Sequence, residues 1–361
     1  MLRRSTLFKT QQDQGAQFVE YRGWEVPARF ATIDEEYEAI GASAGLIDLS
    51  SSGVIEVMGL DRTQFLHRVL TNDINVLTSG RGCYATFLTP QGRAVADMRV
   101  YCTNDSLLLT VEAGLVEKLV TGLRKFSIGN RVELLDRSND LALLSIQGPK
   151  SGEFLAEVTP NLEIPGEPFD HAVTQIGSAN VRICCVRRTL RSGYDLLVPH
   201  EDLEQTWLFL IERGKPWGIR MAGLEPWNVH RVEAGIPLYG VDFDEGQIPL
   251  EAGLDSAISL KKGCYIGQEI IARATYLGHL NRKLAGLLVA GYQPTAKGTK
   301  ILRDQKEVGW ITSSVYSPGL KRCIALGYLR REAWEPGTSL VIDTSSGGVG
   351  CEVTTLPFVS S

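Results

Sequence analysis

The 361-residue sequence lacks the cysteine pairs that define disulfide-rich and zinc-binding proteins. Its seven cysteines are an odd number, and apart from the adjacent Cys184 and Cys185 they stand singly, with no Cys-x-x-Cys spacing. Neither a disulfide framework nor a metal site within this chain is therefore expected. Unpaired cysteines suit a reducing compartment, so we expect a cytoplasmic protein.

The sequence also lacks a long apolar segment and an excess of basic residues. No run of about 18 apolar residues occurs, and the N-terminal "MLRRSTLFKTQQDQG" has no apolar stretch behind its charges. We expect neither a membrane span nor a secretory signal. The net charge of -5 disfavours nucleic-acid binding, which normally requires a basic surface. Any anionic ligand must therefore meet a local basic patch.

What is present fits a globular protein of two or three domains, since 43% of the residues are hydrophobic and 22% are charged. Helix-like and strand-like patterns follow one another without a regular alternation, which favours an α+β fold. From residue 284 onward, short apolar strands separated by Gly and Pro turns predict a small β-barrel. We therefore predict domains at 1–283, with two interleaved subdomains, and at 284–361.

The segment 82–111, "GCYATFLTPQGRAVADMRVYCTNDSLLLTV", predicts three strands with turns at 90–92 and 104–105. In the middle strand Ala96 and Met98 share one face, and Asp97 projects from the other beside Arg99. The residues alone leave open whether this pair is solvated or functional. Before this segment, "GLDRTQFLHRVL" predicts a helix with Asp61 as its N-cap.

A second informative segment is "SLKKGCYIGQEIIARA", in which Cys264 lies between glycines. The cations of this region, opposed within 261–283 only by Glu269, are Lys261, Lys262, Arg273, Arg282 and Lys283. Such a basic patch would receive ligand carboxylates and favour the reactive thiolate of Cys264. A solvated basic surface with a structural cysteine is the alternative.

Six stretches, taken together and in order, resemble the folate-dependent aminomethyltransferase, or T-protein, of the glycine cleavage system. They are "YRGWEVPARF", "AGLIDLSSSG", "FLHRVLTNDI", "SIQGPKSGEFL", "RVEAGIPLYGVDFDE" and "VGWITSSVYSPGLKRCIALGYL". The resemblance runs nearly end to end. It implies a T-protein-like folate-binding fold and tetrahydrofolate as the cofactor.

Within that superfamily, "KGCYIGQE" resembles the signature of the YgfZ branch. That resemblance implies a tetrahydrofolate-binding protein that supports assembly or repair of iron–sulfur proteins, with Cys264 as the key thiol. One thiolate cannot hold a cluster, which generally takes four protein ligands. Two alternatives stay open: an aminomethyltransferase or related demethylase, and a scaffold that has lost its ligand.

The T-protein resemblance also implies roles for individual residues. The family's catalytic strand "GGxxDD" aligns with "GRAVAD", which retains Asp97 and has Ala96 in place of the neighbouring acid. Tyr84 and Arg231 match positions that line the folate cavity, although Arg231 has the alternative role of bracing a buried carboxylate such as Glu233. We expect Lys262 and Arg273 to contact the glutamyl carboxylates of folate.

Two departures from the T-protein pattern weaken the expected pterin contacts. The family's "GYTGE" stretch is shortened here to "TLRSGYD", and the asparagine of "VVNA" falls near 111–112. Each lost polar pair is expected to cost about 1 to 3 kcal/mol. Folate binding is therefore expected to be weaker or altered.

Overall fold

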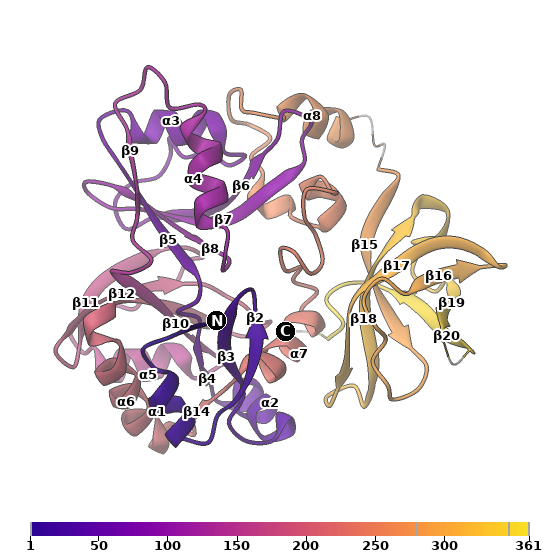
Figure 1. Cartoon of the computed structure of the whole chain (residues 1–361), viewed down its shortest axis with the longest axis horizontal. Coiled ribbons are helices and arrows are strands. Elements are labelled where there is room, and N and C mark those ends of the chain that lie inside the picture. Colours follow the sequence, from indigo (N-terminus) through magenta and orange to yellow (C-terminus); the bar gives the residue numbers. More distant parts are fainter. Residues whose placement is uncertain (1, 277, 279, 346, 360–361) are drawn as a thin grey trace. The chain divides into compact units, whose positions relative to one another are not determined.

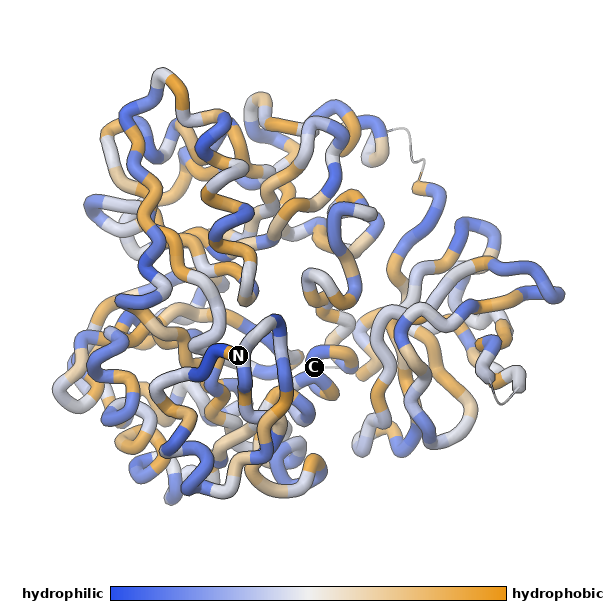
Figure 2. The backbone as a smooth tube through the Cα atoms, viewed as in Figure 1, coloured by the Kyte–Doolittle hydropathy of each residue, from blue (hydrophilic) through white to orange (hydrophobic). Residues whose placement is uncertain are grey.

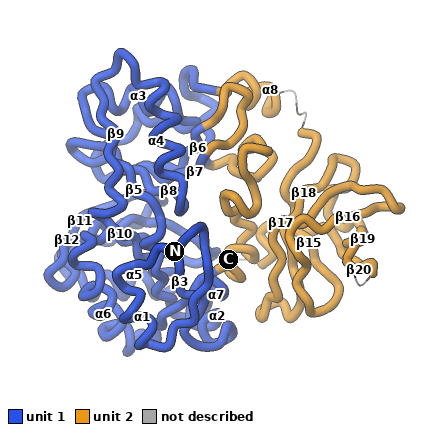
Figure 3. Tube along the Cα trace, viewed as in Figure 1, with its two compact units in different colours: residues 1–87, 96–227, 257–266 blue, residues 88–95, 228–256, 267–361 orange. Residues whose placement is uncertain are grey.

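The structure is a computed structural model that describes residues 2–276, 278, 280–345 and 347–359. The chain divides into two compact units, each built from several segments (Figure 3). Unit 1 comprises residues 1–87, 96–227 and 257–266, and unit 2 comprises residues 88–95, 228–256 and 267–361.

The first large sheet of unit 1 has five strands in the order β6-β7-β8-β5-β9 (Figure 1). Its strands are β5 (Gly53–Met58), β6 (Gly82–Leu88), β7 (Ala94–Cys102), β8 (Leu107–Val111) and β9 (Glu133–Asp136). Helices α3 (Arg62–Val69) and α4 (Val116–Arg124) belong to the same region.

One face of this sheet packs against α4. A Cβ atom added to Gly53 would lie 2.1 Å from Cγ2 of Val116 on that helix and 2.9 Å from Cγ2 of Val111. Val111 is paired with Met98 in the β7–β8 ladder, so Met98 lies on the same face. Because side chains alternate along a strand, Asp97 projects from the opposite face of β7.

The second large sheet has six strands in the order β11-β12-β13-β10-β4-β14. Its strands are β4 (Gly45–Asp48), β10 (Leu141–Gln147), β11 (His171–Ile176), β12 (Ala179–Cys185), β13 (Gly193–Pro199) and β14 (Arg220–Met221). Alternate residues such as Leu144, Ile183 and Leu196 form a core with Phe154 of α5 (Ser151–Val158) and Trp207 of α6 (Leu203–Gly214).

The other faces of the two large sheets meet inside unit 1. The ring of Tyr101 on β7 contacts the ring of His171 on β11 edge to face, with centroids 5.4 Å apart. The backbone N–H of His171 donates to the carbonyl of Gly80 at 2.8 Å. The polar residues of β7 therefore lie between two sheets and not on a solvated surface.

The remaining elements of unit 1 are a small N-terminal sheet and several short helices. A three-stranded sheet has the order β1-β3-β2, with β1 (Arg3–Arg4), β2 (Gln17–Tyr21) and β3 (Trp24–Arg29). The other helices are α1 (Phe8–Asp13) and α2 (Ile33–Ala42), together with the 3-10 segments η1 (His200–Asp202) and η2 (Lys215–Trp217). Helix α7 (Leu224–Glu233) begins in unit 1 and ends in unit 2.

Unit 2 contains a closed barrel in the strand order β15-β18-β17-β16-β19-β20 (Figure 1). Its strands are β15 (Arg282–Val289), β16 (Lys300–Arg303), β17 (Lys306–Ser317), β18 (Arg322–Arg330), β19 (Ser339–Thr344) and β20 (Gly347–Thr354). Alternate apolar residues such as Leu287, Ile311 and Ala325 fill its interior. The unit also includes α8 (Gln268–Tyr276), η3 (Pro249–Ala252) and η5 (Arg331–Ala333), while η4 (Asp255–Ala257) begins in unit 2 and ends in unit 1.

The fold confirms the expected α+β class with a C-terminal β-barrel. The turns expected at 90–92 and 104–105 separate β6, β7 and β8 as predicted. Asp61 stands at the N-cap position of α3, but its side chain makes no capping bond and instead pairs with Arg131 at 3.0 Å. The capping prediction was therefore wrong, because a charged partner outcompetes the helix N–H groups for this carboxylate.

Hydrophobic and hydrophilic residues alternate over short intervals along the chain (Figure 2). Across the described residues, none of the helices combines the length and the hydrophobicity needed to cross a membrane.

Candidate active site

Asp97 lies on the inner face of β7 and is only 7% exposed. Tyr84 on β6 donates its hydroxyl to Oδ2 of Asp97 at 2.7 Å. The Tyr84 ring stacks on the ring of Phe169, with centroids 6.2 Å apart. The guanidinium of Arg99 lies over the Tyr84 ring, 5.7 Å from its centroid. Asp97 and Tyr84, which the T-protein resemblance assigned to the same cavity, are in direct contact, and the solvated alternative for Asp97 was wrong.

The inner face of β7 and β8 carries polar atoms without a partner. Among the described residues, nothing in hydrogen-bonding range satisfies Oδ1 of Asp97, Nε of Arg99, the hydroxyl of Tyr101 or Oγ1 of Thr110. The β7–β8 register places Arg99 directly opposite Thr110, so these groups share one face. Buried polar groups are almost always paired, so a cluster of free ones indicates a place where a polar ligand completes the hydrogen bonds.

Burial is the main cause of the altered pKa values of Asp97 and Tyr84. It raises the pKa of Asp97, whereas Arg99 and the hydrogen bond from Tyr84 lower it. Burial and the nearby Asp97 raise the pKa of Tyr84 well above its ordinary value, so Tyr84 stays a hydrogen-bond donor. A carboxylate with a raised pKa and a free oxygen is a stronger proton acceptor than a solvated one.

Glu112 is a second acid of this site that the sequence analysis did not identify as one. It accepts a hydrogen bond from the hydroxyl of Tyr21 at 2.9 Å, and its charge raises the pKa of Asp97. Extending the observed pairing of Met98 with Val111 by one residue puts Asp97 opposite Glu112. The turn at 104–105 already carried this signal in the sequence, because the turn fixes the hairpin register.

The loss of the family's neighbouring acid at position 96 does not change this face. Ala96 is 1% exposed and, by alternation, points to the α4 side of β7, away from Asp97. An acid there would lie on the core side of the sheet. Having Ala96 in place of an acid therefore leaves the polar groups around Asp97 unchanged.

The shortened "TLRSGYD" stretch forms a closed ion pair beside the site. Arg188 donates to both oxygens of Asp195 at 2.8 and 2.7 Å, and Ser145 donates to Oδ1 at 2.8 Å. Both charged side chains are buried, with 5% and 1% of their surfaces exposed. Asp195 therefore does not replace the missing glutamate as a ligand for a pterin ring.

Arg231 belongs to unit 2, and its guanidinium is fully used there. Nη1 donates to Asp242 at 2.6 Å and to the carbonyl of Ile236 at 2.7 Å, while Nε and Nη2 donate to Asn228 at 3.0 and 2.7 Å. Nη2 also donates to Ser313 of β17 at 2.9 Å. The bracing role foreseen for Arg231 is present, but its partner is Asp242 and not Glu233.

Three of the five cations expected to form a basic patch near Cys264 have partners of their own. Arg273 pairs with Glu269 at 3.1 Å, and Arg282 pairs with Glu251 at 3.2 Å. The ammonium of Lys262 donates to the carbonyls of His67, Leu70 and Asn72, the last two at 2.6 and 3.0 Å. The basic patch therefore stays a prediction, and the charge count behind it included Glu269 but not Glu251 or these three carbonyls.

Three residues of the "KGCYIGQE" loop, Lys262, Tyr265 and Gly267, have structural roles. Tyr265 is buried, with the Lys262 ammonium 5.0 Å from its ring. Gly267 has φ +79°, and a Cβ atom there would lie 2.7 Å from the carbonyl oxygen of Thr89. Cys264 is exposed, as expected of an accessible thiol. Among the described residues no group of three or more His, Cys, Asp or Glu is arranged to hold a metal ion.

The fold and the site together define a class: a two-unit α+β protein with a closed C-terminal barrel and a buried carboxylate–phenol pair. Residues 7–262 match the GCVT N-terminal domain, and residues 282–360 match the glycine cleavage T-protein C-terminal barrel domain. The chain belongs to the glycine cleavage T-protein family.

Individual relatives agree along the whole chain. It is 32% identical to the aminomethyltransferase of Halothermothrix orenii, covering 99% of this chain and 100% of that one. It is 31% identical to the aminomethyltransferase of Bacillus subtilis, covering 99% of both. The crystal structure of glycine cleavage system aminomethyltransferase T from Bartonella henselae superposes with a TM-score of 0.91 at 22% identity, covering 99% and 98% of the two chains.

These relatives are named aminomethyltransferase, which favours the enzyme alternative over the YgfZ-type interpretation.

Proposed function

We propose that the chain is a tetrahydrofolate-dependent aminomethyltransferase in which Asp97 is the proton-accepting residue. The observation that carries the proposal is the buried Asp97, held by Tyr84 through one oxygen and free at the other. Family membership and the names of the full-length relatives support the same activity.

The residues present suit a folate. The free polar atoms of Asp97, Arg99, Tyr101 and Thr110 supply both acceptors and donors for the polar edge of a ring. Folate contributes the two amine nitrogens between which a one-carbon unit is held. The missing glutamate of "GYTGE" is not replaced by Asp195, so we expect weaker pterin contacts here.

The proposed reaction moves the carbon of an aminomethyl group from a lipoyl sulfur to folate. The carbon–sulfur and carbon–nitrogen bonds of the aminomethyl group break, and two bonds from that carbon to folate nitrogens form. The two hydrogens lost from these nitrogens end on the lipoyl sulfur and on the departing ammonia. Oδ1 of Asp97 accepts a proton from a folate amine, while Tyr84 fixes the orientation of the carboxylate.

The test measures tetrahydrofolate binding by calorimetry and ammonia release from an aminomethyl-lipoyl carrier protein. We expect the protein to bind tetrahydrofolate and to release ammonia only when it is present. Asp97→Asn should keep binding and lose turnover, whereas Asp304→Asn, at an exposed barrel turn, should behave as the parent protein. Tetrahydrofolate binding without ammonia release by the parent protein would refute the transferase proposal.

A second candidate is the YgfZ-type role in supporting iron–sulfur proteins, and the exposure of Cys264 favours it. The thiol is accessible in a loop in which Lys262, Tyr265 and Gly267 have structural roles. The deciding experiment is complementation of cells that lack this function, with the parent protein and with Cys264→Ser. Full complementation by Cys264→Ser would remove the thiol from this candidate role.

A further inference from the structure

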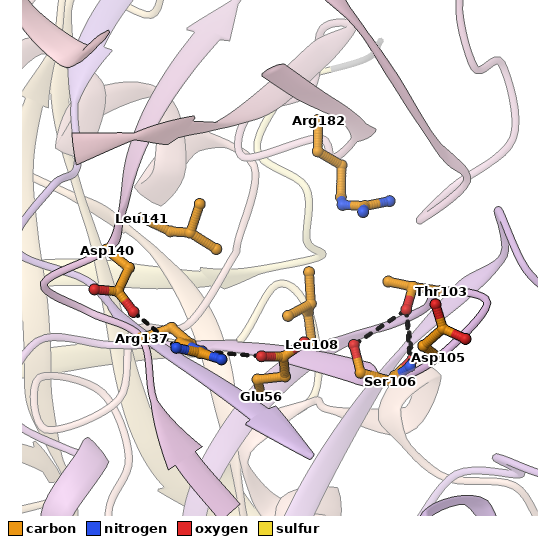
Figure 4. A pocket seen from close by; sticks show the side chains of 9 residues that line it. All are labelled: Glu56, Thr103, Asp105, Ser106, Leu108, Arg137, Asp140, Leu141 and Arg182. Carbon is orange, nitrogen blue, oxygen red and sulfur yellow. Dashed lines mark hydrogen bonds and ion pairs between the residues drawn. The ribbon is translucent and has the colours of Figure 1, made fainter. Parts of the chain in front are cut away.

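A pocket of about 380 Å³ lies in unit 1, apart from the residues that surround Asp97. It is lined by β5, β8, β10 and β12 together with the β7–β8 turn and the segment between β9 and β10 (Figure 4). Leu108 and Leu141 give it an apolar wall. Its other side chains are mostly charged, and their pairing shows what a ligand would have to supply.

The pocket has two half-buried cations, and of these Arg182 lacks an acidic partner among the described residues. Its Nη1 lies 2.8 Å from Nδ1 of His171, and no carboxylate in the described part of the chain is within ion-pair distance. Because a guanidinium only donates, Nδ1 of His171 accepts, so the imidazole is neutral. Burial first, and then Arg182, lower the pKa of His171 to about 4, which agrees with a neutral ring.

The pocket has more carboxylates than the paired guanidinium of Arg137 can neutralise. Arg137 pairs with both Glu56 at 2.9 Å and Asp140 at 3.0 Å, so two carboxylates share one guanidinium. Asp105, exposed in the β7–β8 turn, has no cation within ion-pair distance among the described residues. In the view of Figure 4, Arg182 lies apart from the Arg137–Glu56 pair, with Leu108 between them.

The lining therefore offers an unpaired positive group, an unpaired negative group and an apolar wall. Three carboxylates against two guanidiniums make the pocket slightly acidic in total, which disfavours a simple anion. A simple cation would leave Arg182 uncompensated. A ligand that carries both charges satisfies Arg182 and Asp105 at once without adding net charge.

We propose that this pocket binds a zwitterionic amino acid with an aliphatic side chain. Arg182 holds the carboxylate in the two-pronged geometry that guanidinium groups favour. Asp105 faces the ammonium group, and Leu108 and Leu141 contact the side chain. The site shares no lining residue with the Asp97 site, and the proposal goes beyond the aminomethyl transfer proposed above.

The experiment is a calorimetric titration of the full chain with three probes of matched size. L-leucine carries both charges, 4-methylpentanoate only the carboxylate and 3-methylbutylamine only the ammonium. We expect saturable binding of leucine and at least about tenfold weaker binding of each single-charge probe. Arg182→Gln should weaken leucine binding about tenfold or more, and Asp105→Asn about threefold.

Arg187→Gln is the matched control, because Arg187 is an exposed arginine just beyond β12 and outside the pocket. It should bind leucine as the parent protein does. The proposal is overturned if leucine shows no saturable binding at millimolar concentration, or if 4-methylpentanoate binds as tightly as leucine. It is also overturned if Arg187→Gln weakens binding as much as Arg182→Gln.

If the thermal melt shows that Arg182→Gln does not fold, the test rests on Asp105→Asn, because Asp105 is exposed and its replacement should not disturb folding. Unchanged leucine affinity in that variant would contradict the proposal.

Discussion

Asp97 in unit 1 and Arg231 in unit 2 are both buried charged residues, yet their surroundings differ in one decisive respect. Arg231 donates to Asp242, Asn228, Ser313 and the carbonyl of Ile236, which uses its whole guanidinium. Asp97 has one bonded oxygen and one free oxygen. A satisfied buried charge braces the fold, whereas an unsatisfied one is available for a ligand.

The same contrast separates the two groups of residues expected to bind folate. Asp97 and Tyr84 lie together on an inner face that has further free polar atoms. Arg231, Lys262 and Arg273 are engaged with partners of their own. Folate contacts from these three cations stay a prediction, and they would require the existing bonds to be exchanged.

The largest expected effect comes from Asp97→Asn. It should lower the rate of ammonia release by about 10²- to 10⁴-fold, the range for a general base. The free energy of unfolding should stay equal or rise, because a buried carboxylate with a raised pKa is itself destabilising when ionised. Steady-state kinetics and urea unfolding of the same preparation test both halves. A large loss of stability would show that Asp97, like Arg231, has a structural role.

The second largest effect is expected for Arg231→Gln in unit 2, where stability should change and ligand binding should not. Arg231→Gln leaves Asp242 buried without its cation and should lower the free energy of unfolding by about 3 to 5 kcal/mol. Tetrahydrofolate affinity of the folded fraction should change little. Arg330→Gln, an exposed arginine on the barrel, is the control and should shift stability by less than about 0.5 kcal/mol. A selective loss of folate affinity without loss of stability would contradict the bracing role.

The third prediction concerns Lys262. Lys262→Met removes the donor that the carbonyls of His67, Leu70 and Asn72 share, and it should cost about 1 to 3 kcal/mol of unfolding free energy. Lys261→Met changes an exposed neighbour and should be nearly neutral. Urea unfolding of the two variants measures the difference. Equal stability of both variants would mean that the ammonium of Lys262 does not hold these carbonyls in solution.

The fourth prediction is a change in pH dependence. Ionised Asp97 is the active form, so transfer activity should rise with pH through the raised pKa of Asp97. The hydrogen bond from Tyr84 lowers that pKa, so Tyr84→Phe should move the rising limb of the pH–rate profile to higher pH. If the rising limb of the Tyr84→Phe profile stays at the same pH, the rise in activity does not report the ionisation of Asp97.

The stability of the protein should show the opposite trend over the same range. Because the folded-state pKa of Asp97 lies above the unfolded value, its contribution to stability falls as pH rises between the two. Asp97→Asn should remove that slope, as measured by urea unfolding across pH.

The smallest effect is expected for Cys264→Ser. The thiol is exposed, so its replacement should leave the melting temperature, tetrahydrofolate affinity and ammonia release unchanged. A loss of iron–sulfur complementation in the same variant would show that the thiol serves the second candidate role and not transfer. A lower melting temperature would mean that Cys264 contributes to packing.

Much of the hairpin that carries Asp97 could be predicted from the sequence. The turns at 90–92 and 104–105 and the alternation around Asp97 gave the strands and the face correctly, because both depend on local geometry. The role of Glu112 followed from the same register and was missed. The burial of Asp97 could not be predicted, since it depends on the second sheet, whose strands lie far away in the sequence.

The basic segment shows the opposite outcome. Charges counted along 261–283 suggested a patch, but Glu251 and the carbonyls of 67–72 come from other parts of the chain and take up Arg282 and Lys262. Asp61 followed the same pattern, since Arg131 is 70 positions away. Partners distant in sequence decided each of these cases.

The sequence by itself determined the α+β class, the β7 hairpin, the C-terminal barrel and the family, because local periodicity and ordered motifs carry that information. Only the tertiary structure decided which charges are free: it paired Arg231 with Asp242 and Arg282 with Glu251. Among the described residues it left Oδ1 of Asp97 without a hydrogen-bond partner and Arg182 without an acidic one, with only His171 beside its guanidinium. The physical reason is that hydrogen bonds and ion pairs act over a few ångströms in space, whatever the separation along the chain.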